Sequence, residues 1–184
     1  LLNTYYKEEI IETEVNPHLY QLSSGGISLL PYSSEDLELS ARVAALKTDL
    51  FDNVALEQYF LRILEGKDST REEISLALFG LSSFDMPILS RLQVWLTRDD
   101  LSAVEKIYLA QALYNIGDGE TARDMYFELL SEYAQEKEPY IKMQTSEDQE
   151  EIFKATSLTA VLASSLGRDE ALGLWDYLVD NQKL

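Results

Sequence analysis

The sequence predicts an all-α protein made of antiparallel helical hairpins. Apolar residues recur at the spacing i, i+3, i+4 and i+7 in one segment after another, which marks one buried face on each helix. Gly66, Gly117 and Gly167 fall between such segments, where glycine ends helices most readily. No segment alternates apolar and polar residues between hairpin turns, so the sequence predicts no sheet.

Residues 1–34 form the least regular part of the chain. A short helix is expected over 4–15. It should end before Pro17, because proline disfavours helical geometry in the residue before it. A Gly-Gly pair then predicts a turn, and residues 27–32 are expected to be extended or irregular. The first long helix follows from about residue 36 to residue 47, with Ser33 or Ser34 as its N-cap.

Clear start signals mark the next three helices. Asn53 is expected to cap a helix that ends at Gly66. Ser69 and Glu72 have the spacing of a capping box, in which each side chain satisfies a backbone donor. Pro87 opens another helix, since a proline in the first turn loses no hydrogen bond. The apolar stripes of these helices are Leu56, Tyr59, Phe60, Ile63 and Leu64; Ile74, Ala77, Leu78 and Leu81; and Ile88, Leu89, Leu92, Trp95 and Leu96.

Two helical hairpins complete the chain. Residues 108–130 read as two amphipathic helices folded back at a glycine turn, and residues 158–178 repeat the pattern. Large aromatic residues on such stripes usually pack in the core. The second hairpin is therefore expected to bury the stripe Ala171, Leu172, Trp175 and Leu178.

Residues 134–145 form the longest connection in the helical region. Their lack of periodicity predicts a solvated connector that is anchored by Tyr140 or Ile141. Two further capping boxes are predicted, at 102–105 and at 146–149, and each one marks the start of a helix. The sequence as a whole predicts about nine helices.

The spacing of the hairpins separates two helical architectures. A tetratricopeptide array repeats about every 34 residues, and Ala112, Tyr114 and Gly117 imitate its pattern. The next comparable glycine, Gly167, lies 50 residues further on, and no regular register continues. Irregular hairpins of this length favour a partial or complete alpha/alpha toroid, in which inner and outer helices alternate.

Four blocks of the chain, taken in order, resemble the thioester-domain region of the alpha-macroglobulin family. They are residues 25–46, a Gly-Gly turn followed by a small-residue helix; 74–81 with 92–96; 108–130; and 151–178, an Ala-Thr helix followed by a Trp-containing helix. The family fold is an alpha/alpha toroid. The resemblance covers the chain from about residue 20 onward and implies a bacterial secreted or cell-surface parent protein.

The reactive site of that family has no counterpart in this chain. The family carries a Cys-x-Glu-Gln thioester, and this sequence contains no cysteine. The resemblance therefore implies the toroid without its covalent chemistry. We expect residues 1–184 to be a single helical domain excised from a longer protein, with part of the toroid missing and apolar surface exposed near Ala160, Ala163 and residues 172–179.

Composition excludes two classes of partner. The 33 acidic and 15 basic residues give a net charge of −18, which repels nucleic acids and anionic membrane surfaces. No apolar run is long enough to span a bilayer. We therefore expect no nucleic-acid binding and no membrane insertion.

No catalytic, cofactor-binding or metal-binding residue is predicted. His18 is the only histidine, and a lone imidazole makes no zinc site. The acidic cluster 147–151 lacks the spacing of a calcium loop and reads as a first helical turn. Asp85, Asp99, Asp100 and Asp118 read as turn and cap residues. The tyrosines Tyr5, Tyr6, Tyr20 and Tyr32 suggest either a docking surface or an aromatic recognition patch.

The leading hypothesis is a non-catalytic protein-interaction or structural module of a macroglobulin-like secreted or surface protein. Its partners would be proteins or neighbouring domains of the parent chain, with self-association as a further possibility. Two alternatives stay open. One is a toroid enzyme acting on a glycan or isoprenoid substrate, for which a central pocket lined by two convergent carboxylates would be the sign. The other is a tetratricopeptide-like adaptor that binds an extended peptide.

Overall fold

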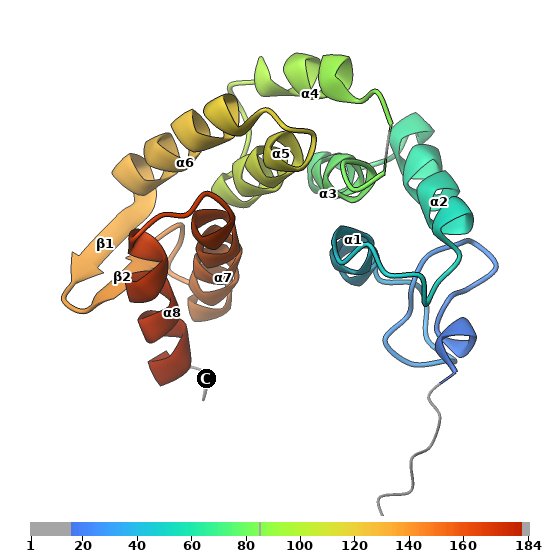
Figure 1. Ribbon diagram of the computed structural model, residues 1–184, viewed down its shortest axis with the longest axis horizontal. Coiled ribbons are helices and arrows are strands. Elements are labelled where there is room, and N and C mark those ends of the chain that lie inside the picture. The colour runs from blue at the N-terminus through green and yellow to red at the C-terminus, as the bar shows by residue number, and fades with distance from the viewer. Residues whose placement is uncertain (1–15, 85, 182–184) are drawn as a thin grey trace, which may run out of the picture.

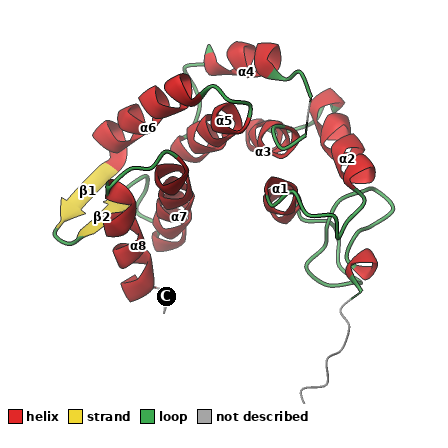
Figure 2. Cartoon of the chain, viewed as in Figure 1, coloured by secondary structure: helices red, strands yellow, loops and turns green. Residues whose placement is uncertain are grey.

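The computed structural model describes residues 16–84 and 86–181. Within them lie one short 3-10 turn, eight α-helices and one two-stranded sheet, so the all-α class is confirmed (Figure 2). The elements are η2 (Pro17–Leu19), α1 (Leu37–Ala45), α2 (Asn53–Glu65), α3 (Arg71–Leu81), α4 (Leu89–Leu96), α5 (Ala103–Asn115), α6 (Gly119–Tyr133), β1 (Ala134–Lys137), β2 (Tyr140–Met143), α7 (Gln149–Ser165) and α8 (Glu170–Asn181). The short helix expected over residues 4–15 lies outside the described residues.

The helices form a two-layered open arc (Figure 1). Helices α1, α3, α5 and α7 line its inner side, and each packs against the next one. Helices α2, α4, α6 and α8 lie outside them, each over its partner in the inner layer. Helices α7 and α8 make one end of the arc, and α1 with the loop before it lies at the other end. None of the described helices is long and apolar enough to cross a membrane.

Small residues and hydroxyl side chains let the inner helices pack closely. Ser40, Ser75, Thr156 and Thr159 are all buried. Each donates its hydroxyl hydrogen to the backbone carbonyl four residues earlier, at 2.6 to 3.0 Å. A buried hydroxyl without a partner would be costly, so this pattern removes the penalty while keeping the side chains small.

Most helix starts lie one or two residues from the predicted caps. The capping box of Ser102 and Glu105 is confirmed. The box predicted at Ser69 is wrong by one residue, because Thr70 and Glu73 form it. The hydroxyl of Ser69 instead donates to the carbonyl of Ile63, 2.6 Å away, and thereby ties this turn to the end of α2.

Three further helices have an aspartate as their N-cap, where the sequence predicted a nearby serine or asparagine. Asp36, Asp52 and Asp148 each have an extended backbone and accept a hydrogen bond from a backbone N–H of the following helix. The predictions of Ser33 or Ser34, Asn53 and Ser146 are therefore wrong. An N-cap needs both an acceptor side chain and a non-helical backbone, and sequence spacing alone does not show at which residue the chain turns.

The predicted glycine turns are confirmed. Gly66 is the C-cap of α2. Gly117 and Gly167 follow α5 and α7 with φ of 92° and 63°, a left-handed conformation that glycine adopts without the strain of a Cβ atom.

The prediction of no sheet is wrong for the connector between α6 and α7. Strands β1 and β2 pair antiparallel from Ala134 opposite Met143 to Lys137 opposite Tyr140. Strand β1 is largely exposed, which removes the alternation that marks a strand in sequence. Strand β2 packs on α7 and α8, and Met143 is fully buried.

The prediction that Trp175 belongs to the core is wrong. Its side chain is 41% exposed and Leu172 is 73% exposed, whereas Leu174 and Leu178 are buried. The buried face of α8 consists of Ala171, Gly173, Leu174, Tyr177 and Leu178. This face is turned away from the predicted stripe because α8 must cover both α7 and β2.

Candidate functional site

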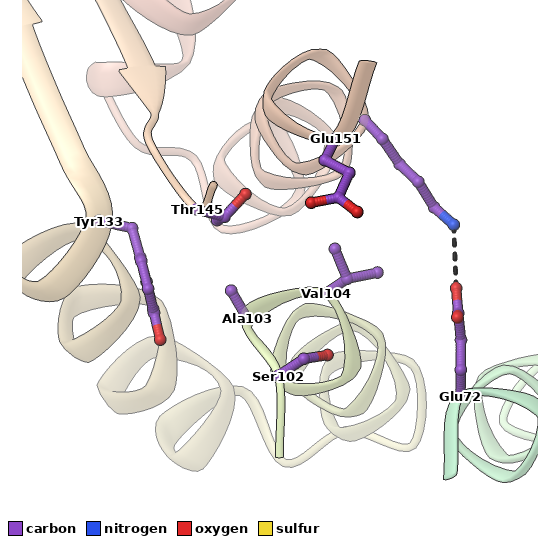
Figure 3. Close-up of a pocket in the computed structure, with 8 residues that line it drawn as sticks. Glu72, Ser102, Ala103, Val104, Tyr133, Thr145 and Glu151 are labelled. Carbon is purple, nitrogen blue, oxygen red and sulfur yellow. Dashed lines mark hydrogen bonds and ion pairs between the residues drawn. The ribbon is translucent and has the colours of Figure 1, made fainter. Parts of the chain in front are cut away.

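A polar pocket of about 420 Å³ lies between the N-terminal halves of α5 and α7. Glu72 from α3 and Glu151 from α7 bring carboxylates to it, and Ser102, Tyr133 and Thr145 bring hydroxyl groups (Figure 3). Lys154 completes the lining. The pocket therefore holds the two carboxylates that the enzyme hypothesis requires, but it also holds a cation.

Lys154 neutralises carboxylates from two other inner helices. Its Nζ lies 3.0 Å from Glu38 Oε2 on α1 and 3.0 Å from Glu72 Oε1 on α3. Arg42 makes a second ion pair with Glu38, at 2.5 Å. The three inner helices are thus linked by one cation across the concave side of the arc.

These contacts shift the pKa values of the paired groups. Partial burial alone would raise the pKa of Glu38, but the hydrogen bonds and positive charges of Lys154 and Arg42 outweigh it and lower that pKa. Burial would likewise lower the pKa of Lys154, yet its two carboxylate partners raise it. Both groups therefore stay charged over a wider pH range than they would alone.

Tyr108 lies beneath this cluster with its ring stacked on Phe79, 5.8 Å between centroids. The Nζ of Lys154 is 6.0 Å from the Tyr108 ring centroid. The Tyr108 hydroxyl is buried without a hydrogen-bond partner among the described residues. Burial, together with the negative charge of Glu38, raises the pKa of Tyr108, so this phenol stays protonated.

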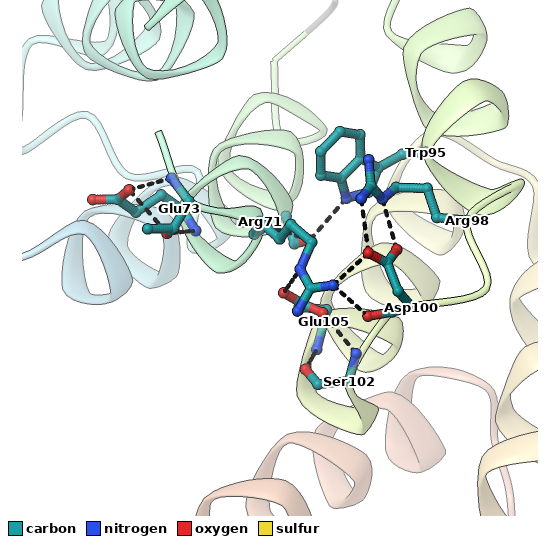
Figure 4. A network of polar contacts seen from close by, with 9 residues as sticks. Arg71, Glu73, Trp95, Arg98, Asp100, Ser102 and Glu105 are labelled. Atoms are coloured by element: carbon teal, nitrogen blue, oxygen red, sulfur yellow. Dashed lines mark hydrogen bonds and ion pairs between the residues drawn. The ribbon is translucent and has the colours of Figure 1, made fainter. Parts of the chain in front are cut away.

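A second polar network fixes the turn between α4 and α5 (Figure 4). Arg71 donates to the backbone and side chain of Asp100, and Arg98 donates to both carboxylate oxygens of Asp100 at 2.9 Å. The hydrogen bonds from Arg98 and Arg71 lower the pKa of Asp100 to about 2. Arg98 also stacks on Trp95, whose indole N–H donates to Ser75. Because all of these groups are mutually satisfied, the network is structural.

The end of the arc formed by α7 and α8 exposes apolar side chains. Leu172, Trp175 and Val179 lie on one face of α8 at the spacing i, i+3 and i+7, and they are 73%, 41% and 60% exposed. Val161 on α7 is 47% exposed. We name these four residues the C-terminal face. The expectation of exposed apolar surface holds for Leu172, Trp175 and Val179, but it is wrong for Ala160, Ala163, Leu174 and Leu178, which are buried.

A groove of about 350 Å³ adjoins this end of the molecule. Phe153 and Ser157 of α7 and Asn181 of α8 line it, with Arg42 of α1 on its far side. Trp175 donates its indole N–H to the hydroxyl of Ser164, 3.2 Å away. The indole is therefore held across α7 and α8 with one side open to solvent.

The residues considered from sequence do not assemble into one site. His18 is exposed and lies in the short turn η2. Asp118 caps α6, as its turn position suggested. Asp148, which was expected in the first turn of a helix, is the N-cap of α7. Tyr32 is 85% exposed, whereas Tyr5, Tyr6 and Asp85 lie outside the described residues. No group of three or more His, Cys, Asp or Glu residues within 16–84 and 86–181 is placed to hold a metal ion.

The comparisons with known proteins leave the family of this chain open. No family model, no curated protein and no solved structure matches it. The resemblance to the alpha-macroglobulin family therefore remains a hypothesis.

Sequence reasoning missed the cluster of Glu38, Glu72 and Lys154. These residues lie far apart in the chain. Glu38 alone reads as part of a solvated helix face, Glu72 is assigned to a capping box, and Lys154 is not singled out. The signal that was available is their position near the start of an inner helix, since parallel inner helices bring such residues together.

Proposed function

We propose that the chain is a non-catalytic protein-interaction or structural module of a macroglobulin-like secreted or surface protein. The observation that carries this proposal is the C-terminal face at the end of the helical arc. Helix α8 turns a leucine, a tryptophan and a valine on one of its faces toward solvent. Large apolar side chains gathered on one exposed face are typical of an interaction site.

The inner side of the arc supports a non-catalytic role. A carboxylic acid that protonates a substrate needs a raised pKa near the working pH. The pKa of Glu38 is lowered, and Glu72 shares the same lysine partner. These carboxylates are arranged to link helices α1, α3 and α7, which favours a structural task.

Two features support the macroglobulin-like part of the proposal. The four blocks of resemblance follow one another in the family order, and inner and outer helices alternate along the arc as in part of an alpha/alpha toroid (Figure 1). A parent protein that is secreted or displayed on a bacterial surface belongs to the same proposal.

The enzyme alternative is favoured by one observation, the joint presence of Glu72 and Glu151 in the polar pocket. If it is correct, glycan or isoprenoid substrates should be turned over, and Glu151→Gln should abolish the turnover. Reproducible activity with that dependence would contradict the non-catalytic proposal.

Selection of binders from a displayed library of helical hairpins tests the interaction module. We expect selected binders to lose affinity for the double variant Leu172→Ser and Trp175→Ser. They should keep their affinity for Val54→Ser with Val94→Ser, because those valines are 72% and 69% exposed on the outer helices α2 and α4. The proposal would be refuted if none of the selected binders lost affinity for the double variant at the C-terminal face.

A further inference from the structure

We infer that the C-terminal face binds an amphipathic helix whose apolar residues are flanked by lysine or arginine side chains. This inference rests on the proposed function and names the chemistry of the partner. Three properties of the face lead to it: its length, the small side chains of α7 and the acidic residues around it.

The exposed side of α7 has the shape that a neighbouring helix requires. Helices α3 and α5 each pack closely against two inner helices, whereas α7 packs closely against one described inner helix, α5, and reaches α1 and α3 through the ion pairs of Lys154. Along this side of α7 lie the small residues Ser157, which is half-buried, and Val161 and Ser164, which are exposed. Small side chains at the contact let helix axes approach to about 8 Å. This surface therefore suits a helix laid along α7.

The larger side chains of α8 supply the anchors. Leu172, Trp175 and Val179 repeat at helical spacing along one line, and Trp175 is held by its hydrogen bond to Ser164. Buried tryptophan is among the commonest anchors of helix-in-groove binding. At 1.5 Å per residue, α7 is about 25 Å long, so the occupant would be a helix of about 16 residues.

The acidic residues around the C-terminal face indicate that the partner helix carries basic side chains. Asp176 lies within the exposed stripe of α8 and forms no salt bridge with another described residue. Asp169, Asp180 and Glu150 are exposed near the ends of the same two helices. The nearby cations are engaged: Lys154 and Arg42 pair with Glu38, and Arg168 pairs with Glu170.

A second copy of the chain fits this face poorly. It would place another acidic surface against the first, and each chain carries a net charge of −18. Like charges brought together at an interface oppose association. A helix with a basic rim instead gains from every carboxylate around the face.

Calorimetric titration with three synthetic helical peptides of about 16 residues tests the inference. The first carries leucine on one face and lysine on its flanks. The second has glutamate in place of lysine, and the third has serine in place of leucine. At physiological ionic strength, we expect the Leu/Lys peptide to bind at micromolar concentration and each of the others at least tenfold more weakly.

Variants locate the site and separate its two components. Leu172→Ser changes a side chain that is 73% exposed and should weaken the Leu/Lys peptide without changing the circular dichroism spectrum. The double variant Leu172→Ser with Trp175→Ser should bind the Leu/Lys peptide at least tenfold more weakly. The control variant Val54→Ser with Val94→Ser should bind it as the wild type does. Asp176→Asn should weaken the binding of the Leu/Lys peptide and leave the binding of the other two peptides unchanged.

Each contrary result has a distinct meaning. Equal binding of the Leu/Lys and Leu/Glu peptides, both dependent on Leu172, would overturn the basic partner and leave the proposed function standing. Equal binding of the Ser/Lys peptide would show attraction to a polyanion and overturn the docking of an apolar helix. Sedimentation of the free chain as a dimer that Leu172→Ser with Trp175→Ser abolishes would identify a second copy as the occupant and overturn the inference.

Discussion

The contact between α2 and α3 gives the sharpest prediction of stability. Gly80 lies in α3 against the ring of Phe60 in α2. A Cβ atom at this position would lie 2.5 Å from Phe60 Cζ and 2.7 Å from Cε1 and Cε2. Phe60 is fully buried, with Tyr59 and Phe84 at 5.6 and 6.5 Å between ring centroids. Relief of this close contact therefore requires a fully buried ring to shift among its aromatic neighbours.

Gly80→Ala should destabilise the protein by about 1–2 kcal/mol. Overpacking a buried site costs about 1–3 kcal/mol, and alanine returns up to about 1 kcal/mol through its better helix propensity. Gly119→Ala is the matched control, because it also lies in a helix and no atom lies within 4 Å of the added Cβ atom. It should stabilise the protein by about 0.5 kcal/mol.

Urea unfolding followed by circular dichroism measures both variants. The loss in Gly80→Ala corresponds to a fall in Tm of about 2–8 °C for a domain of this size. If Gly80→Ala were as stable as Gly119→Ala, the close packing of Phe60 on α3 would be refuted.

Three further perturbations have definite expected outcomes. Lys154→Met should cost about 1–2 kcal/mol at pH 7, between the values for exposed and buried ion pairs. Because the pKa of Glu38 is lowered from 4.5 in the folded state, this stabilisation is present above pH 4.5 and is lost as the pH falls through the folded pKa; thermal unfolding should show the difference between wild type and variant shrinking at low pH, and an unchanged difference would contradict the ion pair. Gly173→Ala would place a Cβ atom 2.8 Å from Ile141 Cγ1, so hydrogen exchange should accelerate in residues 134–143, and unchanged protection would count against this packing. Ser102→Ala should cost about 1 kcal/mol through loss of the N-cap, whereas Ser131→Ala, on the exposed side of α6, should leave the free energy of unfolding unchanged within about 0.5 kcal/mol.

Helical periodicity predicted buried positions in both layers. Leu78 and Leu81 of the inner helix α3 are buried, and so are Leu56 and Leu92 of the outer helices α2 and α4, as their spacing predicted. Periodicity was less reliable for α8, where two adjacent faces are apolar and only one of them is covered. Which of Leu174 and Trp175 is buried depends on β2, and the sequence did not reveal that strand.

The site depended on contacts between distant parts of the chain. Lys154 pairs with Glu72, which lies 82 residues away in the sequence. No feature of the sequence marks that pairing. Exposure near residues 172–179 was predicted from the resemblance to a toroid, and the side chains that carry it became clear only from the packing of α8.

The fluorescence of Trp175 during binding tests the central claim most directly. The chain has two tryptophans, so Trp95→Phe leaves Trp175 as the only source of tryptophan emission. We predict that the Leu/Lys peptide shifts the emission of this variant to shorter wavelength, because the exposed indole becomes buried, and that the shift saturates with the Kd found by calorimetry. If the peptide binds with no change in Trp175 emission, the partner docks elsewhere and the C-terminal face is not the interaction site.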